Sequence, residues 1–113
     1  MIRFWEAIQD RISGKAPKGA KRNPGWTKFR KTHLNQFPDC YVCGAVTKLQ
    51  VHHIVPFHVA PDLELNPENV LTLCTGGKHK GLNCHLIFGH HGNYKKVNID
   101  CLDEAVYWRG KLL

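Results

Sequence analysis

Two short stretches, Leu49-Gln-Val-His-His-Ile-Val55 and Val70-Leu-Thr-Leu-Cys74, decide the fold of this sequence. Both are short and rich in β-branched and aliphatic residues, a composition that favours strands. Residues 56–67 between them begin and end with proline, and Asn66-Pro-Glu-Asn69 has the composition of a turn. We therefore predict two strands joined by a loop.

Helical patterns surround these strands. Trp26–Phe37 carries its apolar residues toward one face and stops before Pro38, as helices do ahead of proline. The other predicted helices are Ile2–Ile12, Cys84–Phe88 with Asn83 as its cap, and Ala105–Leu113. The order of elements predicts an α+β protein, with an N-terminal helix and basic linker in residues 1–25 and a folded domain in residues 26–113.

The charge of the chain points to a polyanionic partner. Its 113 residues carry a net charge of +7, and residues 11–36 contain eight basic side chains and no carboxylate. Such a run is typical of phosphate binding, although a solubilising flexible arm would have the same composition. The candidate nucleic-acid contacts are Lys15, Lys18, Lys21, Arg22, Lys28, Arg30 and Lys31.

The N-terminus and the cysteines predict a cytoplasmic location. No apolar run approaches the roughly 20 residues of a membrane-spanning helix. The first ten residues mix both charge signs, unlike a signal peptide. In a reducing compartment five cysteines, an odd number, favour metal binding over disulfides.

Four of the cysteines form a candidate zinc site. Cys40 and Cys43 have the C-x2-C spacing of a zinc knuckle, Cys74 ends the second predicted strand, and Cys84 begins a predicted helix. His79 lies inside the long gap between the second pair and is an alternative ligand. Cys101 has no evident partner, so we assign it to packing.

Three histidines are candidates for a second site. His52 and His53 are adjacent in a predicted strand, so their side chains point to opposite sides of it. Both can serve one cleft if the strand twists or ends there. His85 directly follows Cys84, and it could share a second metal with His52.

Several motifs, in order, resemble the His-Asn-His (HNH) nuclease family in its zinc-knuckle form. They are Val51-His-His-Ile-Val-Pro56, Pro67-Glu-Asn-Val-Leu-Thr-Leu-Cys74 and Asn83-Cys-His85, together with the stretch from Trp26 to Gly44 and Phe88-Gly-His with Asn93-Tyr downstream. Small phage-associated members are especially similar. The resemblance implies a ββα-metal fold, with two strands and a helix around one catalytic cation, and a metal-dependent DNA endonuclease.

The resemblance also implies a role for each site residue. His53 would be the general base, with a near-neutral pKa suited to deprotonating water. Asn69 would hold the loop and orient His53. His52 and His85 would bind the catalytic ion, Mg²⁺ or Mn²⁺, which stabilises the charge of the transition state. His90 lies five positions after His85, one more than the helical step that aligns two ligands. It is a candidate third ligand if the helix ends at Gly89, and otherwise a candidate phosphate contact.

Many family members have Asp where His52 stands here. Two imidazoles are softer ligands, so Ni²⁺ and Zn²⁺ are further candidates for the catalytic ion. A monomer with one site would nick double-stranded DNA, whereas a weak dimer could cut both strands. Phage packaging machinery is a further partner that the resemblance implies.

A non-catalytic, zinc-stabilised nucleic-acid-binding module is the alternative interpretation. The same cysteines and basic residues would serve it. Such a module has no need for the set His52, His53, Asn69 and His85, which favours the nuclease.

Overall fold

The computed structural model describes residues 23–78, 82–94 and 96–113. The predicted N-terminal helix, four candidate nucleic-acid contacts and the alternative zinc ligand lie outside these residues. They are Ile2–Ile12, Lys15, Lys18, Lys21, Arg22 and His79.

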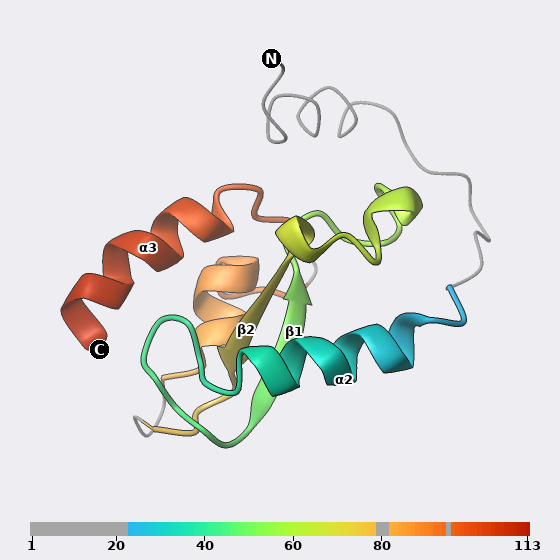
Figure 1. The fold of residues 1–113 in the computed structure, drawn as a ribbon. Helices are drawn as coiled ribbons and strands as arrows, with labels where there is room; N and C mark the ends of the chain where they lie inside the picture. The colour runs from blue at the N-terminus through green and yellow to red at the C-terminus, as the bar shows by residue number, and fades with distance from the viewer. Residues whose placement is uncertain (1–22, 79–81, 95) are drawn as a thin grey trace, which may run out of the picture.

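The described chain is a small α+β structure, as the sequence predicts (Figure 1). Its elements are the helix α2 (Trp26–Gln36), the strands β1 (Leu49–His53) and β2 (Val70–Cys74), a π-helical turn (His85–Gly89) and the helix α3 (Cys101–Leu112). Two short 3-10 turns, Pro61–Leu63 and Pro67–Asn69, interrupt the loop between the strands.

The two strands pair antiparallel, with His52 opposite Leu71 and His53 opposite Val70. The second strand has the predicted bounds, whereas the first ends at His53 and not at Val55. It ends there because the backbone of Val55 is occupied by the side chain of Asn69, which takes the place of a partner strand.

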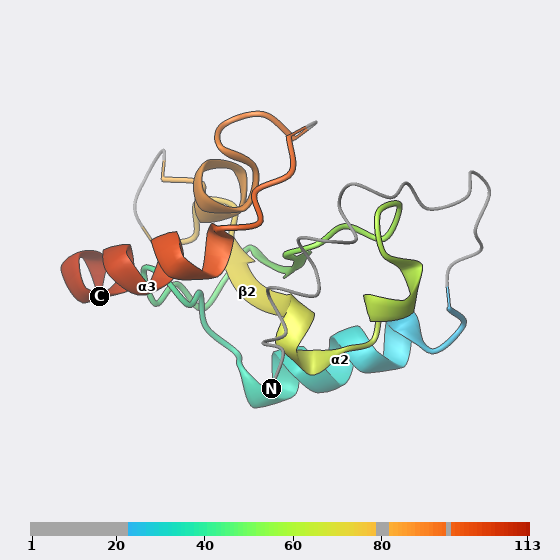
Figure 2. The same ribbon diagram turned by 90° about the horizontal axis from the view of Figure 1, so that it is seen from above.

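In Figure 2 the strands lie between two helical elements: α2 is below them in the picture, and the π-helical turn is above them. The alternation of a strand explains the contacts across these layers. The ring of His52 meets residues of the π-helical turn, and the ring of its neighbour His53 meets Trp26 of α2.

The core is formed by the strands, the π-helical turn and the cysteines. Ile54, Leu73 and Phe88 are buried in it. The helix α3 lies beside the π-helical turn (Figure 1), and the rings of Trp108 in α3 and Phe88 in the turn are 6.2 Å apart. Such a small core gives limited stability, so a metal that crosslinks it would contribute substantially to folding. Within the described residues, no helix has the length and apolar character needed to cross a membrane.

Candidate functional site

The four cysteines of the predicted zinc site converge. The sulfur atoms of Cys40, Cys43, Cys74 and Cys84 all lie within 4.8 Å of one another, and all four residues are buried. The Sγ atoms of Cys43 and Cys74 are 3.5 Å apart. A tetrahedral zinc ion with Zn–S bonds of about 2.3 Å separates its sulfurs by about 3.8 Å. The four cysteines could therefore hold a metal such as zinc, and Cys84 belongs to the cluster despite its long spacing from Cys74.

The thiols have unequal proton affinities. The hydrogen bond with Cys84 lowers the pKa of Cys40 to about 4, and the same contact raises the pKa of Cys84. Burial raises the pKa of Cys43 to about 11. Burial acts to raise the pKa of Cys74, but backbone hydrogen bonds with Gly76 and Gly77 bring it below its ordinary value. The protein alone thus favours the thiolate at Cys40 and Cys74, while four neighbouring thiolates need a cation to offset their repulsion.

Three histidines form a second cluster. One ring nitrogen of each of His52, His85 and His90 lies within 4.8 Å of the others. The Nε2 atoms of His85 and His90 are 3.2 Å apart, close to the ~3 Å that separates nitrogen ligands of one ion. The Nε2 of His52 is buried, and within residues 23–78, 82–94 and 96–113 it has no hydrogen-bond partner. A buried nitrogen beside two other imidazole nitrogens fits a divalent cation with nitrogen affinity.

The π-helical turn explains how His90 joins this cluster. His85 and His90 are five residues apart, which an α-helix does not align. The i→i+5 repeat of a π-helix does align them. The Nδ1–H of His90 donates to the carbonyl of Lys96 at 3.0 Å, which leaves Nε2 facing His85. Asn83 caps the turn as predicted, because its Oδ1 accepts from the backbone N–H of Leu86.

Burial keeps two of these imidazoles neutral. Together with the smaller effect of nearby histidines, it lowers the pKa of His52 to about 3 and that of His85 to about 4. Both rings are therefore unprotonated at neutral pH and available as ligands.

His53 sits beside this cluster in a fixed orientation. Its ring lies against the indole of Trp26, with 4.5 Å between centroids and an angle of 35° between the ring planes. Its Nε2 is 2.9 Å from the carbonyl oxygen of Glu64. A carbonyl can only accept, so Nε2 carries the proton and, in the neutral ring, Nδ1 carries the lone pair.

Asn69 holds the loop that supplies this carbonyl. It is fully buried; its Nδ2 donates to the carbonyls of Val55 and Leu63, and its Oδ1 accepts from the N–H of Val55. The end of β1 and the residue before Glu64 are thereby joined through one side chain.

The four histidines open into one pocket of about 320 Å³. It is lined by Val51, His52, His53, Pro56, Phe57, His58, His85 and His90. The first strand ends here, so both adjacent histidines reach the same pocket from opposite faces of the strand.

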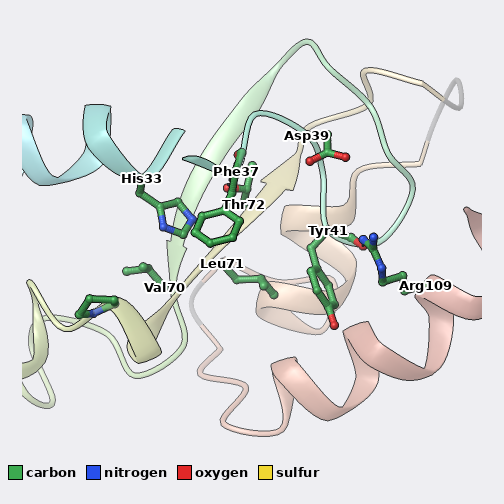
Figure 3. A pocket seen from close by; sticks show the side chains of 9 residues that line it. His33, Phe37, Asp39, Tyr41, Val70, Leu71, Thr72 and Arg109 are labelled. Atoms are coloured by element: carbon green, nitrogen blue, oxygen red, sulfur yellow. Dashed lines mark hydrogen bonds between the residues drawn. The ribbon is translucent and has the colours of Figure 1, made fainter. Parts of the chain in front are cut away.

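A second pocket, of about 340 Å³, shares none of these residues. In Figure 3, His33 of α2 and Phe37 lie at one end of it, and Tyr41 and Arg109 lie at the other. The guanidinium of Arg109 stacks on the ring of Tyr41 at 4.7 Å. His33 is buried, and its Nε2 has no hydrogen-bond partner among the described residues.

The remaining predicted site residues lie on α2. Lys28 and Lys31 are exposed and Arg30 is half-buried. Sequence reasoning assigned Trp26 to the core and did not single out Glu64 or His58. Nothing in the sequence marks the contacts that Trp26 and Glu64 make with His53, because these contacts depend on the path of the loop between the strands.

No protein-family model matches this chain, and neither a curated protein nor a solved structure matches it. The resemblance to HNH nucleases thus stays a prediction that depends on the motifs and on the geometry of the two clusters.

Proposed function

We propose that this protein is a metal-dependent DNA endonuclease of the HNH type, built on a ββα-metal core. One observation carries the proposal: three imidazoles converge on one point of a pocket that a fourth imidazole, held in a single tautomer, also lines. A structural zinc site does not explain this second set, because the cysteine cluster is already complete.

His53 is the proposed general base. Its Nε2–H is engaged by the Glu64 carbonyl, so Nδ1 accepts the proton of the attacking water. The ring need not reorient during the reaction, because the carbonyl and the Trp26 indole already fix it.

The cation would be held by His52, His85 and His90. When bound, a divalent ion there supplies electrostatic stabilisation of the charge that develops on the phosphate and the leaving oxygen. The residues around it keep the imidazoles in place: Lys96 orients His90, and the backbone of Gly89 packs against the ring of His52.

The substrate follows from charge. The chain carries a net charge of +7, and α2 contributes exposed lysines and no carboxylate close to the histidine pocket. Double-stranded DNA is the proposed partner, bound mainly through its phosphates, so affinity should fall steeply with salt. With one histidine pocket among the described residues of the chain, nicked DNA is the expected product.

Incubation of supercoiled plasmid with Mg²⁺, Mn²⁺ or Ni²⁺ tests the proposal, with EDTA as a control. We expect nicked circles from the wild type and at least a hundredfold slower cleavage by His53→Ala. His58→Ala is the matched control, since His58 lines the same pocket but is exposed and outside the cluster. Salt-dependent DNA binding without cleavage in any of these ions would instead support the non-catalytic zinc-stabilised binding module.

A further inference from the structure

A closed circuit of contacts surrounds His53. The Nε2–H of His53 donates to the carbonyl of Glu64, and the carboxylate of Glu64 accepts from the N–H of Asn23 at 2.7 Å. The carbonyl of Asn23 accepts from the N–H of Trp26 at 3.0 Å. The indole of Trp26 contacts the His53 ring in a tilted arrangement and closes the circuit.

The Glu64 side chain is the unusual member of this circuit. It is 1% exposed, and burying a carboxylate is costly unless it is hydrogen-bonded. It accepts from the residue just ahead of α2, where the amino end of a helix favours a negative charge. An aliphatic side chain would fill this space with no such cost, so packing alone does not require a carboxylate here.

We infer that Trp26 and Glu64 are positioning residues for His53, and that they tie the orientation of its ring to the docking of α2 on the loop between the strands. Glu64 anchors the start of α2 through Asn23, and the anchored helix presents the indole that fixes the plane of the imidazole. The inference builds on the proposed function, in which His53 is the general base.

Two pairs of variants separate this role from simple packing. Trp26→Leu keeps an apolar side chain but removes the flat ring, whereas Trp26→Phe keeps a ring. Glu64→Leu removes the side-chain oxygen that accepts from the N–H of Asn23, whereas Glu64→Gln keeps a side-chain acceptor oxygen. The backbone carbonyl that accepts from His53 is present in both variants. Leu34→Ala is the control on the same helix, about 12 Å further along its axis, where it is half-buried.

In plasmid cleavage, we expect Trp26→Leu and Glu64→Leu to lower kcat about tenfold or more, with KM for DNA changed less than twofold. Trp26→Phe and Glu64→Gln should recover kcat to within about threefold of the wild type. A purely structural role predicts instead that kcat follows thermal stability across all five variants, Leu34→Ala included.

A second readout does not depend on nuclease activity. Nitrogen-15 NMR of the zinc-loaded full chain should show His53 as the Nε2–H tautomer in the wild type and a mixture of tautomers in Trp26→Leu. A single tautomer in that variant, or a folded Glu64→Leu with the kcat of the wild type, would overturn the inference. If the wild type cleaves no DNA, the proposed function fails, while the NMR result still decides whether the circuit orients His53.

Discussion

The buried side chain of Asn69 stabilises the end of β1 and the loop that follows it. It makes three hydrogen bonds: two are to the backbone of Val55 just beyond the end of β1, where they replace strand pairing, and the third is to the carbonyl of Leu63 in the loop. Asn69→Ala removes all three and leaves buried backbone groups without partners, so we expect a loss of roughly 2 to 3 kcal/mol in the free energy of unfolding. Urea unfolding of the zinc-loaded protein measures it.

Asn66→Ala is the matched control for this change. Asn66 also caps a backbone N–H, that of Glu68, but it does so near the surface through one hydrogen bond. Its loss should cost about 1 kcal/mol or less. An equal loss of unfolding free energy in Asn69→Ala and Asn66→Ala would mean that the burial of Asn69 does not add to the stability that its hydrogen bonds provide.

His33 contributes to the pH dependence of the fold, together with His52 and His85, whose pKa values are also lowered by burial. Burial lowers the pKa of His33 below its ordinary value of 6.5. Below about pH 6.5, His33 therefore binds a proton more readily in the unfolded chain than in the folded chain. The free energy of unfolding decreases as the pH falls below this value.

We expect His33→Leu to have a smaller loss of unfolding free energy between pH 7.5 and pH 5.5 than the wild type. The variant also removes a buried nitrogen that has no partner in the part of the chain that the structure describes, so its stability at pH 7.5 should be unchanged or higher. Urea unfolding at the two pH values measures both effects. An equal loss of unfolding free energy in the wild type and in His33→Leu would show that His33 does not contribute to this pH dependence.

Among the elements, the π-helical turn is the one on which the histidine cluster depends most directly. Gly89 in this turn approaches the ring of His52 so closely that an added Cβ would lie 3.0 to 3.2 Å from three of its atoms. Gly89→Ala should displace the ring and weaken Mn²⁺ binding at this cluster by about tenfold, as losses around a metal ligand commonly do. Titration calorimetry on the zinc-loaded protein measures the affinity.

Gly110→Ala controls for the glycine substitution itself. An added Cβ at Gly110 in α3 meets nothing within 4 Å. Helix propensity then favours alanine by up to about 1 kcal/mol, with no change in metal affinity. Wild-type Mn²⁺ affinity in Gly89→Ala would show that the His52 ring has room to move.

The strands and α2 could be predicted from sequence because each has a local cause. Val70–Cys74 is a fully buried apolar run, and Pro38 limits how far α2 can extend. The four cysteines were also predictable, since thiolates at such spacings have few other uses in a reducing compartment.

The rest of the site depends on tertiary contacts. A π-helical turn is rare, and nothing local to residues 85–89 distinguishes it from an α-helix. Only the docked turn brings His90 into line with His85. The burial of Glu64 likewise follows from the loop that Asn69 holds in place. Residue patterns named His90 as a candidate ligand but could not decide its role without the conformation of the turn, and the contacts of Glu64 with His53 and Asn23 join segments further apart in the chain.

At the scale of the whole molecule, the cysteine cluster joins three segments. Cys40 and Cys43 lie between α2 and β1, Cys74 ends β2, and Cys84 precedes the π-helical turn. An ion bound there would crosslink all three, and it would hold His85 through its neighbour Cys84. The histidine cluster should therefore exist only when the cysteine cluster is loaded.

We expect the purified protein to contain one tightly held zinc ion, and a strong chelator or Cys40→Ser to unfold it, because binding of such an ion supplies much of the folding free energy of a small domain. Circular dichroism and zinc analysis measure both. Cys101→Ser is the matched control: Cys101 is as deeply buried as Cys40 but lies outside the cluster. It should keep its zinc and its fold, at the cost of a buried hydroxyl. If Cys40→Ser stays folded with its zinc content unchanged, the crosslink between the three segments is not what stabilises this protein.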